Sequence, residues 1–126
     1  GGKTLCVFES AIDALSYLTL LKLRGRDWRT ANTLSLSGIY RPRKDGSIRF
    51  PAALEQYLKD NPGVARIVLC LDKDEPGRAA SAAIQKRLSE YEVIDNPPRS
   101  GKDYNDQLRL VKGISGRVRT RGGDAR

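Results

Sequence analysis

Histidine is absent from the 126-residue sequence, and only two cysteines are present. These absences exclude a histidine-based catalytic triad and a zinc site of the cysteine/histidine type. Cys6 and Cys70 each lie within a short apolar run, so we expect both to be buried, reduced thiols. No apolar stretch approaches the roughly 20 residues of a membrane-spanning helix, and the N-terminus lacks the basic-then-apolar order of a secretory signal. We therefore expect a cytoplasmic protein without a membrane partner.

Acidic residues are outnumbered, with 15 aspartates and glutamates against 23 lysines and arginines and a formal net charge of +8 at pH 7. This excess favours a polyanionic partner, most simply DNA or RNA, although a solvated basic surface has the same composition. Basic residues follow the first expected helix and continue into the next loop. The candidates for contacts to single-stranded nucleic acid are Trp28, which offers a stacking surface, and Arg41, Arg43 and Lys44.

Strand-like and helix-like segments alternate along the chain. Strands are predicted at 4–8, 32–38, 66–71 and 91–94, and helices at 11–23, 51–59, 77–91 and from about residue 103 onward. Proline, glycine and scattered charge at 39–50 predict a loop or small hairpin. The alternating order predicts an α/β fold, a Rossmann-like open sheet of about four mainly parallel strands with helices on both faces.

The length of the chain suits about one domain, and no internal repeat divides it. We place this domain at residues 1–112. The remaining segment, 113–126, is rich in arginine and has little apolar content, so we expect it to be a disordered basic tail.

Acidic residues follow the predicted strands, at the edge where open α/β sheets bind ligands. Glu9 ends the first strand, and Asp72 and Asp74 follow the third. At about 5 Å and an effective dielectric constant near 20, each close carboxylate pair repels by roughly 3 kcal/mol. This repulsion must be compensated. The candidates are raised carboxylate pKa values, the positive charge of Lys73 or Lys102, and bound divalent cations. Ligation by oxygen alone favours hard ions, Mg²⁺ first and Mn²⁺ second.

Each of these side chains also has an ordinary structural interpretation. Glu9 can be a solvated acid that is favoured by the positive end of the helix dipole. Either Asp74 or Glu75 suits the N-cap of the third helix, and capping is compatible with metal binding. Asp13 on an apolar helix is most simply a surface residue, and Lys102 can pair with its neighbour Asp103.

Three segments, LCVFESAIDALSYL, LCLDKDEPGRAA and GKDYND, resemble the TOPRIM domain of bacterial primases, type IA and type II topoisomerases and several nucleases. The resemblance covers residues 4–110 and is nearest to primase- or relaxase-associated modules of Gram-positive mobile elements. It implies an acidic triad of Glu9, Asp72 and Asp74. It further implies catalytic-site roles for Asp13 and Asp103, and it makes Asp106 a candidate contact to nucleic acid. The chain departs from the family pattern at Ser10, where glycine is usual, and at Asn105, where primases often have aspartate.

The resemblance implies that Mg²⁺ or Mn²⁺ is held by Glu9, Asp72, Asp74 and Asp103, with Lys102 near the reacting phosphate. It favours a Mg²⁺-dependent catalytic module for primase-like nucleotidyl transfer in DNA replication or mobile-element transfer. Nucleoside triphosphates and further domains of a longer protein are the expected partners. Alternatives are a TOPRIM nuclease, topoisomerase-like cleavage, a non-catalytic nucleic-acid-binding module and a receiver-type phosphoacceptor domain, which usually has two acids after its first strand.

Overall fold

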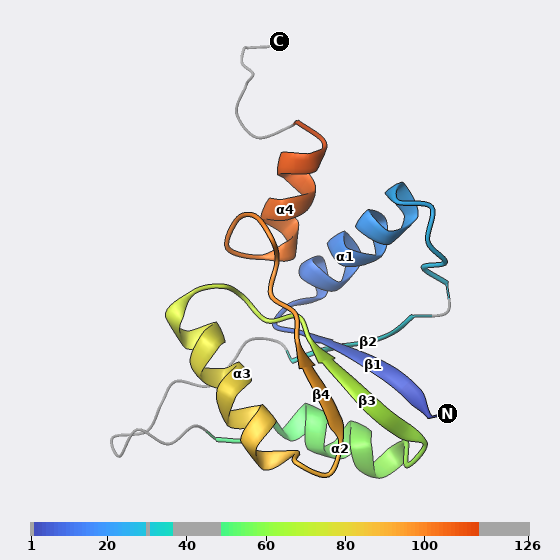
Figure 1. The fold of residues 1–126 in the computed structure, drawn as a ribbon, viewed down its shortest axis with the longest axis vertical. Coiled ribbons are helices and arrows are strands. Elements are labelled where there is room, and N and C mark those ends of the chain that lie inside the picture. The colour runs from blue at the N-terminus through green and yellow to red at the C-terminus, as the bar shows by residue number, and fades with distance from the viewer. Residues whose placement is uncertain (1, 30, 37–48, 114–126) are drawn as a thin grey trace.

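The computed structural model describes residues 2–29, 31–36 and 49–113. Within these ranges, four strands alternate with four helices (Figure 1). They are β1 (Lys3–Phe8), α1 (Ala11–Leu23), β2 (Asn32–Ser35), α2 (Ala52–Asp60), β3 (Val64–Leu69), α3 (Glu75–Arg87), β4 (Glu92–Asp95) and α4 (Tyr104–Val111). Most of the loop predicted at 39–50, the end of the strand predicted at 32–38, and nearly all of the predicted tail lie outside the described residues. The domain boundary at residue 112 stays a prediction.

All four strands are parallel and lie in the order β2-β1-β3-β4, which confirms the predicted open α/β sheet. Strand β1 is paired on both sides, with Cys6 opposite Thr33 of β2 and Val68 of β3. The chain adds β2 on one side of β1 and then adds β3 and β4 on the other side. The carboxyl ends of β1 and β3 therefore form a topological switch point, where ligands bind in sheets of this kind.

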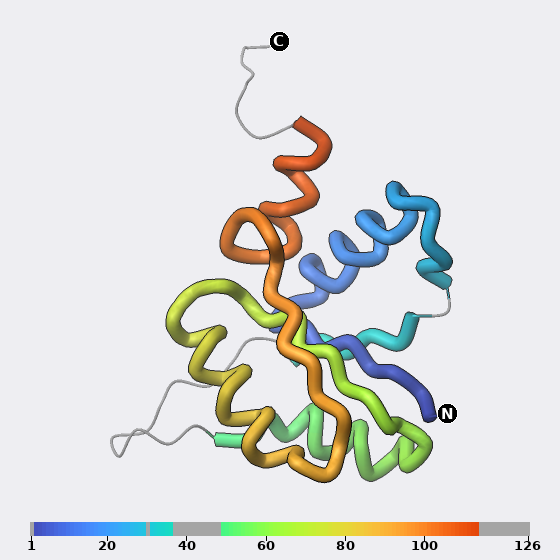
Figure 2. Tube along the Cα trace, viewed as in Figure 1, coloured from blue at the N-terminus to red at the C-terminus, as the bar shows by residue number. Residues whose placement is uncertain are grey.

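Helices cover both faces of the sheet, as the continuous apolar strands predicted. One apolar cluster places Leu5 and Val7 against residues of α2 and α3, including Leu54 and Ile84. Because side chains alternate along a strand, Cys6 and Phe8 point to the opposite face. There they pack with residues of α1 and α4. The helices α1 and α4 pack against each other and can be followed as neighbours in the ribbon and in the tube (Figures 1 and 2).

Two predicted boundaries near the switch point were wrong. Strand β3 covers Val64–Leu69 rather than 66–71, because Val64 is already buried in the core and the chain leaves the sheet after Cys70. Helix α3 covers Glu75–Arg87 rather than 77–91, because Asp74 caps it and a turn at 88–90 precedes β4. Cys6 and Cys70 are buried free thiols, as expected. Among the described residues, no helix has the length and apolar character needed to cross a membrane.

Candidate metal centre

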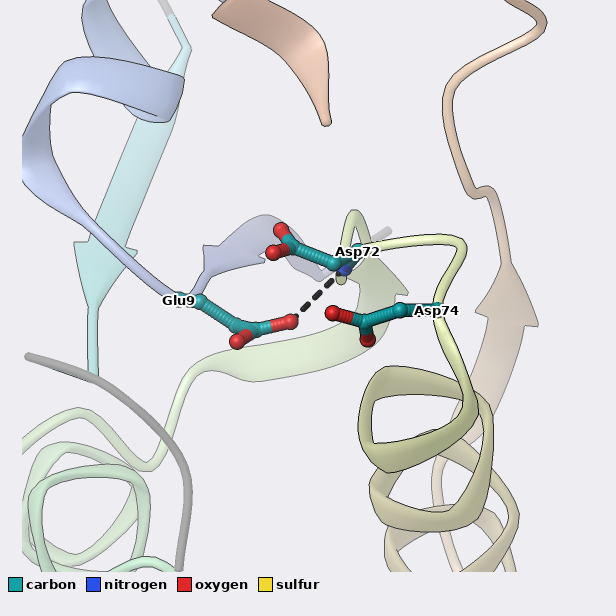
Figure 3. Close-up of side chains that lie close together, drawn as sticks. All are labelled: Glu9, Asp72 and Asp74. Carbon is teal, nitrogen blue, oxygen red and sulfur yellow. Dashed lines mark hydrogen bonds between the residues drawn. The ribbon is translucent and has the colours of Figure 1, made fainter. Parts of the chain in front are cut away.

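Three carboxylates converge at the switch point (Figure 3). Glu9 follows β1 directly, and Asp72 and Asp74 lie on the segment that joins β3 to α3. The Oε2 atom of Glu9 accepts a hydrogen bond of 2.8 Å from the backbone N–H of Asp72. This bond joins two segments 63 residues apart and fixes the Glu9 carboxylate over the end of β3.

One oxygen from each of Glu9, Asp72 and Asp74 lies within 4.8 Å of the other two. Oxygen ligands about 2.1 Å from Mg²⁺ stand about 3 Å apart when adjacent and about 4.2 Å apart across the ion, so small side-chain movements would gather the three around one cation. The donors are all carboxylate oxygens, which suits hard divalent cations. This group can therefore hold a metal ion.

A second group shares Asp72 and adds Asp13 and Asp103, again with one oxygen from each within 4.8 Å. The surface interpretation of Asp13 was wrong, since the residue is only 4% exposed. Its Oδ2 accepts from the hydroxyl of Ser10 at 2.9 Å, and its Oδ1 accepts from the backbone N–H of Asn105 at 3.2 Å. Asp13 was not among the predicted metal ligands, but the geometry makes it a candidate ligand in this second group.

Burial, together with the crowding of the acids, raises the pKa values of three carboxylates in the centre. Burial, and then the negative charge of Glu9 and the other acids, raise the pKa of Asp72 from 3.8 to about 7. Burial also raises the pKa of Glu9, against the effect of its hydrogen bond from Asp72. The pKa of Asp13 is raised by burial too, and its hydrogen bonds with Ser10 and Asn105 offset part of that rise. The cluster thus resists carrying its full negative charge without a cation.

Lys102 supplies the nearest positive charge. Its Nζ lies 3.7 Å from Oδ2 of Asp74 and 4.0 Å from Oδ2 of Asp72, and these two carboxylates raise the pKa of Lys102. Pairing with the adjacent Asp103 is absent from the described ion pairs, so that interpretation was wrong. Lys73 points elsewhere, since its Nζ donates to the backbone carbonyl of Arg99 at 3.0 Å. Lys102 is therefore the lysine that reaches the cluster.

Two acids of the centre also cap helices. Asp74 Oδ1 accepts from the backbone N–H of Gly77 at 2.9 Å, and Asp103 Oδ1 accepts from that of Asp106 at 2.8 Å. Each cap fixes one carboxylate oxygen and leaves the other to face the cluster. Gly77 lies so close to this segment that a Cβ there would collide with the carbonyl oxygen of Asp72 and lie 3.0 Å from Oδ1 of Asp74.

A comparison with protein-family models matches residues 6–108 to the Toprim-like family. The chain belongs to the Toprim-like family. No match was found among curated proteins. Among solved structures, the primase fragment of the Bacteriophage T7 primase-helicase protein resembles this Toprim-like domain with a TM-score of 0.55 and 21% sequence identity. The match covers 91% of this chain and 41% of the phage fragment, so the Toprim-like domain spans less than half of that fragment.

Two residues that sequence reasoning missed position the acids of the Toprim-like domain. Arg78 donates from Nε to the carbonyl of Asp72 at 3.3 Å and forms an ion pair of 2.6 Å with Asp95. Asn105 holds Asp13 through its backbone and accepts from the hydroxyl of Ser16 at 3.2 Å. In the sequence, Arg78 was marked only by its place in the first turn of α3, and Asn105 only by its departure from the aspartate that primases often have there.

The predicted nucleic-acid contacts of the Toprim-like domain are less well defined. Trp28 is half-buried, with the guanidinium of Arg29 5.3 Å from its ring centroid. Asp106 Oδ2 accepts from the backbone N–H of Lys102 at 3.1 Å, so this carboxylate holds the turn before α4. Three further candidates, Arg41, Arg43 and Lys44, lie outside the described residues. The nucleic-acid contacts of all five stay predictions.

The stability of the metal-free Toprim-like domain is expected to fall as the pH rises. In the unfolded chain Asp72 titrates near 3.8, whereas in the folded protein its pKa is about 7. Between these values the folded state binds more protons, so the stabilisation is complete below about pH 4 and is lost as the pH rises to about 7. We expect a loss on the order of 2 kcal/mol in the free energy of unfolding between pH 5 and pH 8.

Urea denaturation in the presence of EDTA measures this loss. Mg²⁺ added at pH 8 should restore stability, since the ion binds the ionised carboxylates of the folded state. A free energy of unfolding that is constant or rises from pH 5 to pH 8 without metal would contradict the expectation.

Proposed function

We propose that this Toprim-like domain is a Mg²⁺-dependent nucleotidyltransferase module of the primase type. The observation that carries the proposal is the pair of oxygen-donor groups that share Asp72 at the carboxyl edge of the sheet. Two ion positions with one shared carboxylate suit an in-line displacement at phosphorus, in which both the attacking and the leaving oxygen need charge stabilisation. The structural similarity to the primase fragment of the T7 primase-helicase protein supports the primase direction of this chemistry.

Five acids would hold the ions, namely Glu9, Asp13, Asp72, Asp74 and Asp103. Bound Mg²⁺ supplies positive charge that neutralises phosphoryl oxygens and orients them for displacement. Lys102, released from its carboxylate partners when a cation enters, carries a mobile positive charge suited to a phosphate. These residues bind and orient the phosphate, which is the main demand of phosphoryl transfer.

Glu9 is also suited to accept a proton. Its Oε2 is fixed by the Asp72 N–H, which leaves Oε1 as the oxygen that would meet a substrate hydroxyl. We assign Oε1 the proton of the attacking 3′-hydroxyl.

Template-holding surfaces are assigned to other domains of a longer protein, because the chain spans only 41% of the T7 primase fragment. DNA or RNA and nucleoside triphosphates are the proposed substrates, and replication or transfer of a mobile element is the proposed setting. The net charge of +8 supports a nucleic-acid substrate.

Labelled oligonucleotides test the reaction. The chain is incubated with Mg²⁺ or Mn²⁺ and a primed single-stranded template plus nucleoside triphosphates, and in parallel with single- and double-stranded DNA alone. We expect extended products that disappear with EDTA. Shortened products in the parallel reactions would instead support a nuclease. Absence of metal-dependent products, together with absence of Mn²⁺ binding in calorimetry, would support a non-catalytic binding module.

A further inference from the structure

A recess of about 170 Å³ lies on the face of the sheet covered by α1 and α4. The end of α1 and the residues just after it form one wall. The segment between β4 and α4, drawn in orange in Figure 2, and the first turns of α4 form the other. The polar residues of this recess are Arg24, Arg26, Asn96, Arg99, Tyr104 and Gln107.

The charge of the recess is positive. Three arginines line it, Arg24 and Arg26 from one wall and Arg99 from the other, and no acidic residue of the described ranges does. None of the three has a carboxylate partner among the described residues, whereas other arginines, such as Arg66 and Arg78, form ion pairs. The recess therefore concentrates positive charge that the described protein leaves unneutralised.

Tyr17 also lines the recess, and the positive charge there affects the pKa of its hydroxyl. Burial raises the pKa of its hydroxyl to about 12, and the positive charges of Arg26 and Arg24 act in the opposite direction. The two guanidinium groups thus act electrostatically on the lining of the recess as well as on the surrounding solvent.

Gln107 provides an independent sign of a missing polar partner. It is 3% exposed, and its Oε1 accepts from the backbone N–H of Arg99 at 2.6 Å. An N–H only donates, so this bond fixes the amide orientation and leaves Nε2 as the donor. No acceptor engages Nε2 in the described part of the chain, and an unsatisfied buried donor costs about 1–3 kcal/mol. A ligand with acceptor oxygens would remove that cost.

We propose that this recess binds phosphate groups of single-stranded nucleic acid that extends from the metal centre. Guanidinium groups and an amide donor match the oxygens of a phosphodiester, and the guanidinium fork binds them in pairs. The assignment to nucleic acid rests on the proposed function, while the phosphate chemistry rests on the recess itself.

The two sites are adjacent along the chain. Tyr104 of the recess directly follows Asp103 of the metal centre, and their Cα atoms are about 3.8 Å apart across the peptide bond. Arg99 precedes Lys102 by three residues, which limits their Cα separation to about 11 Å. The backbone carbonyl of Arg99 is also fixed by Lys73, between Asp72 and Asp74 in sequence. The recess and the metal centre therefore share the segment that leads into α4.

Fluorescence anisotropy of a labelled 12-nucleotide oligothymidylate in EDTA tests the recess without any metal. Each phosphate contact contributes about 0.7 to the slope of log affinity against log salt for single strands. Replacing Arg24, Arg26 and Arg99 together by glutamine should make this slope shallower by about 2 and weaken binding at least tenfold at low salt. Gln107→Glu keeps the acceptor for the Arg99 N–H but replaces the donor, so it should also weaken binding.

Lys86→Gln removes one exposed positive charge from α3, on the other face of the sheet, and should leave the slope nearly unchanged. Single Arg99→Gln is the matched comparison and should lose about 0.7. A parallel titration with ATP in EDTA separates the two sources of phosphate. Weaker binding of the oligonucleotide by the arginine variants supports a path for a nucleic-acid strand. Weaker binding of ATP alone would instead support a nucleotide pocket and contradict the proposal.

Equal slopes for the triple variant and the Lys86 variant, with folding verified by circular dichroism, would overturn the proposal. Because no metal is present, this outcome is separate from failure of the metal-dependent reaction. Arginine-dependent binding without turnover would leave the recess supported and remove only the catalytic proposal.

Discussion

Divalent cations will no longer bind measurably when asparagine replaces Asp72. Asp72 is the one residue that belongs to both candidate ligand groups, so its loss removes a carboxylate from each. We expect the affinity for Mn²⁺ to fall at least about 100-fold, more than the 10- to 100-fold typical of residues that only support a ligand. Isothermal titration with Mn²⁺ at pH 8 measures the effect directly.

The control for Asp72→Asn is Asp60→Asn, which makes the same change at the exposed end of α2. Its Mn²⁺ titration should match that of the unchanged protein. The Asp72 variant should also be more stable without metal at pH 8, because it no longer ionises a buried carboxylate beside Glu9. An unchanged Mn²⁺ isotherm would remove Asp72 from the set of ligands.

Glutamine in place of Glu9 is expected to reduce turnover by about 10²–10⁴-fold, the range of a lost general base. The fold should survive, because the amide oxygen of glutamine can still accept the hydrogen bond from the Asp72 N–H. The primer-extension reaction with Mg²⁺ and nucleoside triphosphates measures turnover, and thermal unfolding verifies the fold.

Glu75→Gln is the matched control for this second experiment. Glu75 lies on the exposed side of the first turn of α3, close in sequence to Asp74, and belongs to neither ligand group. Its variant should retain full turnover. Full turnover of the Glu9 variant would exclude Glu9 from both ligand and proton-transfer roles.

The sheet and its acidic edge could be predicted because both depend on local patterns. Continuous apolar strands indicate burial on two faces, and parallel strands bring their carboxyl ends to one edge. That is why Glu9 and Asp72, 63 residues apart, were predicted to meet. The ends of α3 were less predictable, since the cap at Asp74 and the turn at 88–90 depend on how the chain leaves and re-enters the sheet.

Burial of Asp13 and the arginine recess could not be predicted from sequence patterns. An acid in an apolar helix usually faces solvent, and only the packing of α4 against α1 brings the Asn105 N–H to Asp13. The recess likewise requires Arg24 and Arg99, 75 positions apart, to face the same space. The recess has no periodic or capping signal, whereas the only local signal for Asp13 is its place three residues after the N-cap Ser10.

Gly77 gives the metal centre a requirement that no charged residue reveals. The start of α3 passes so close to Asp72 that even a methyl group at position 77 meets the backbone carbonyl of that residue. Even an uncharged side chain there must displace the backbone of Asp72, although it adds no charge and removes no donor. A loss of activity on substitution of Gly77 would thus report a steric displacement of Asp72 rather than the removal of a ligand. Metal titration, in addition to activity, separates the two causes.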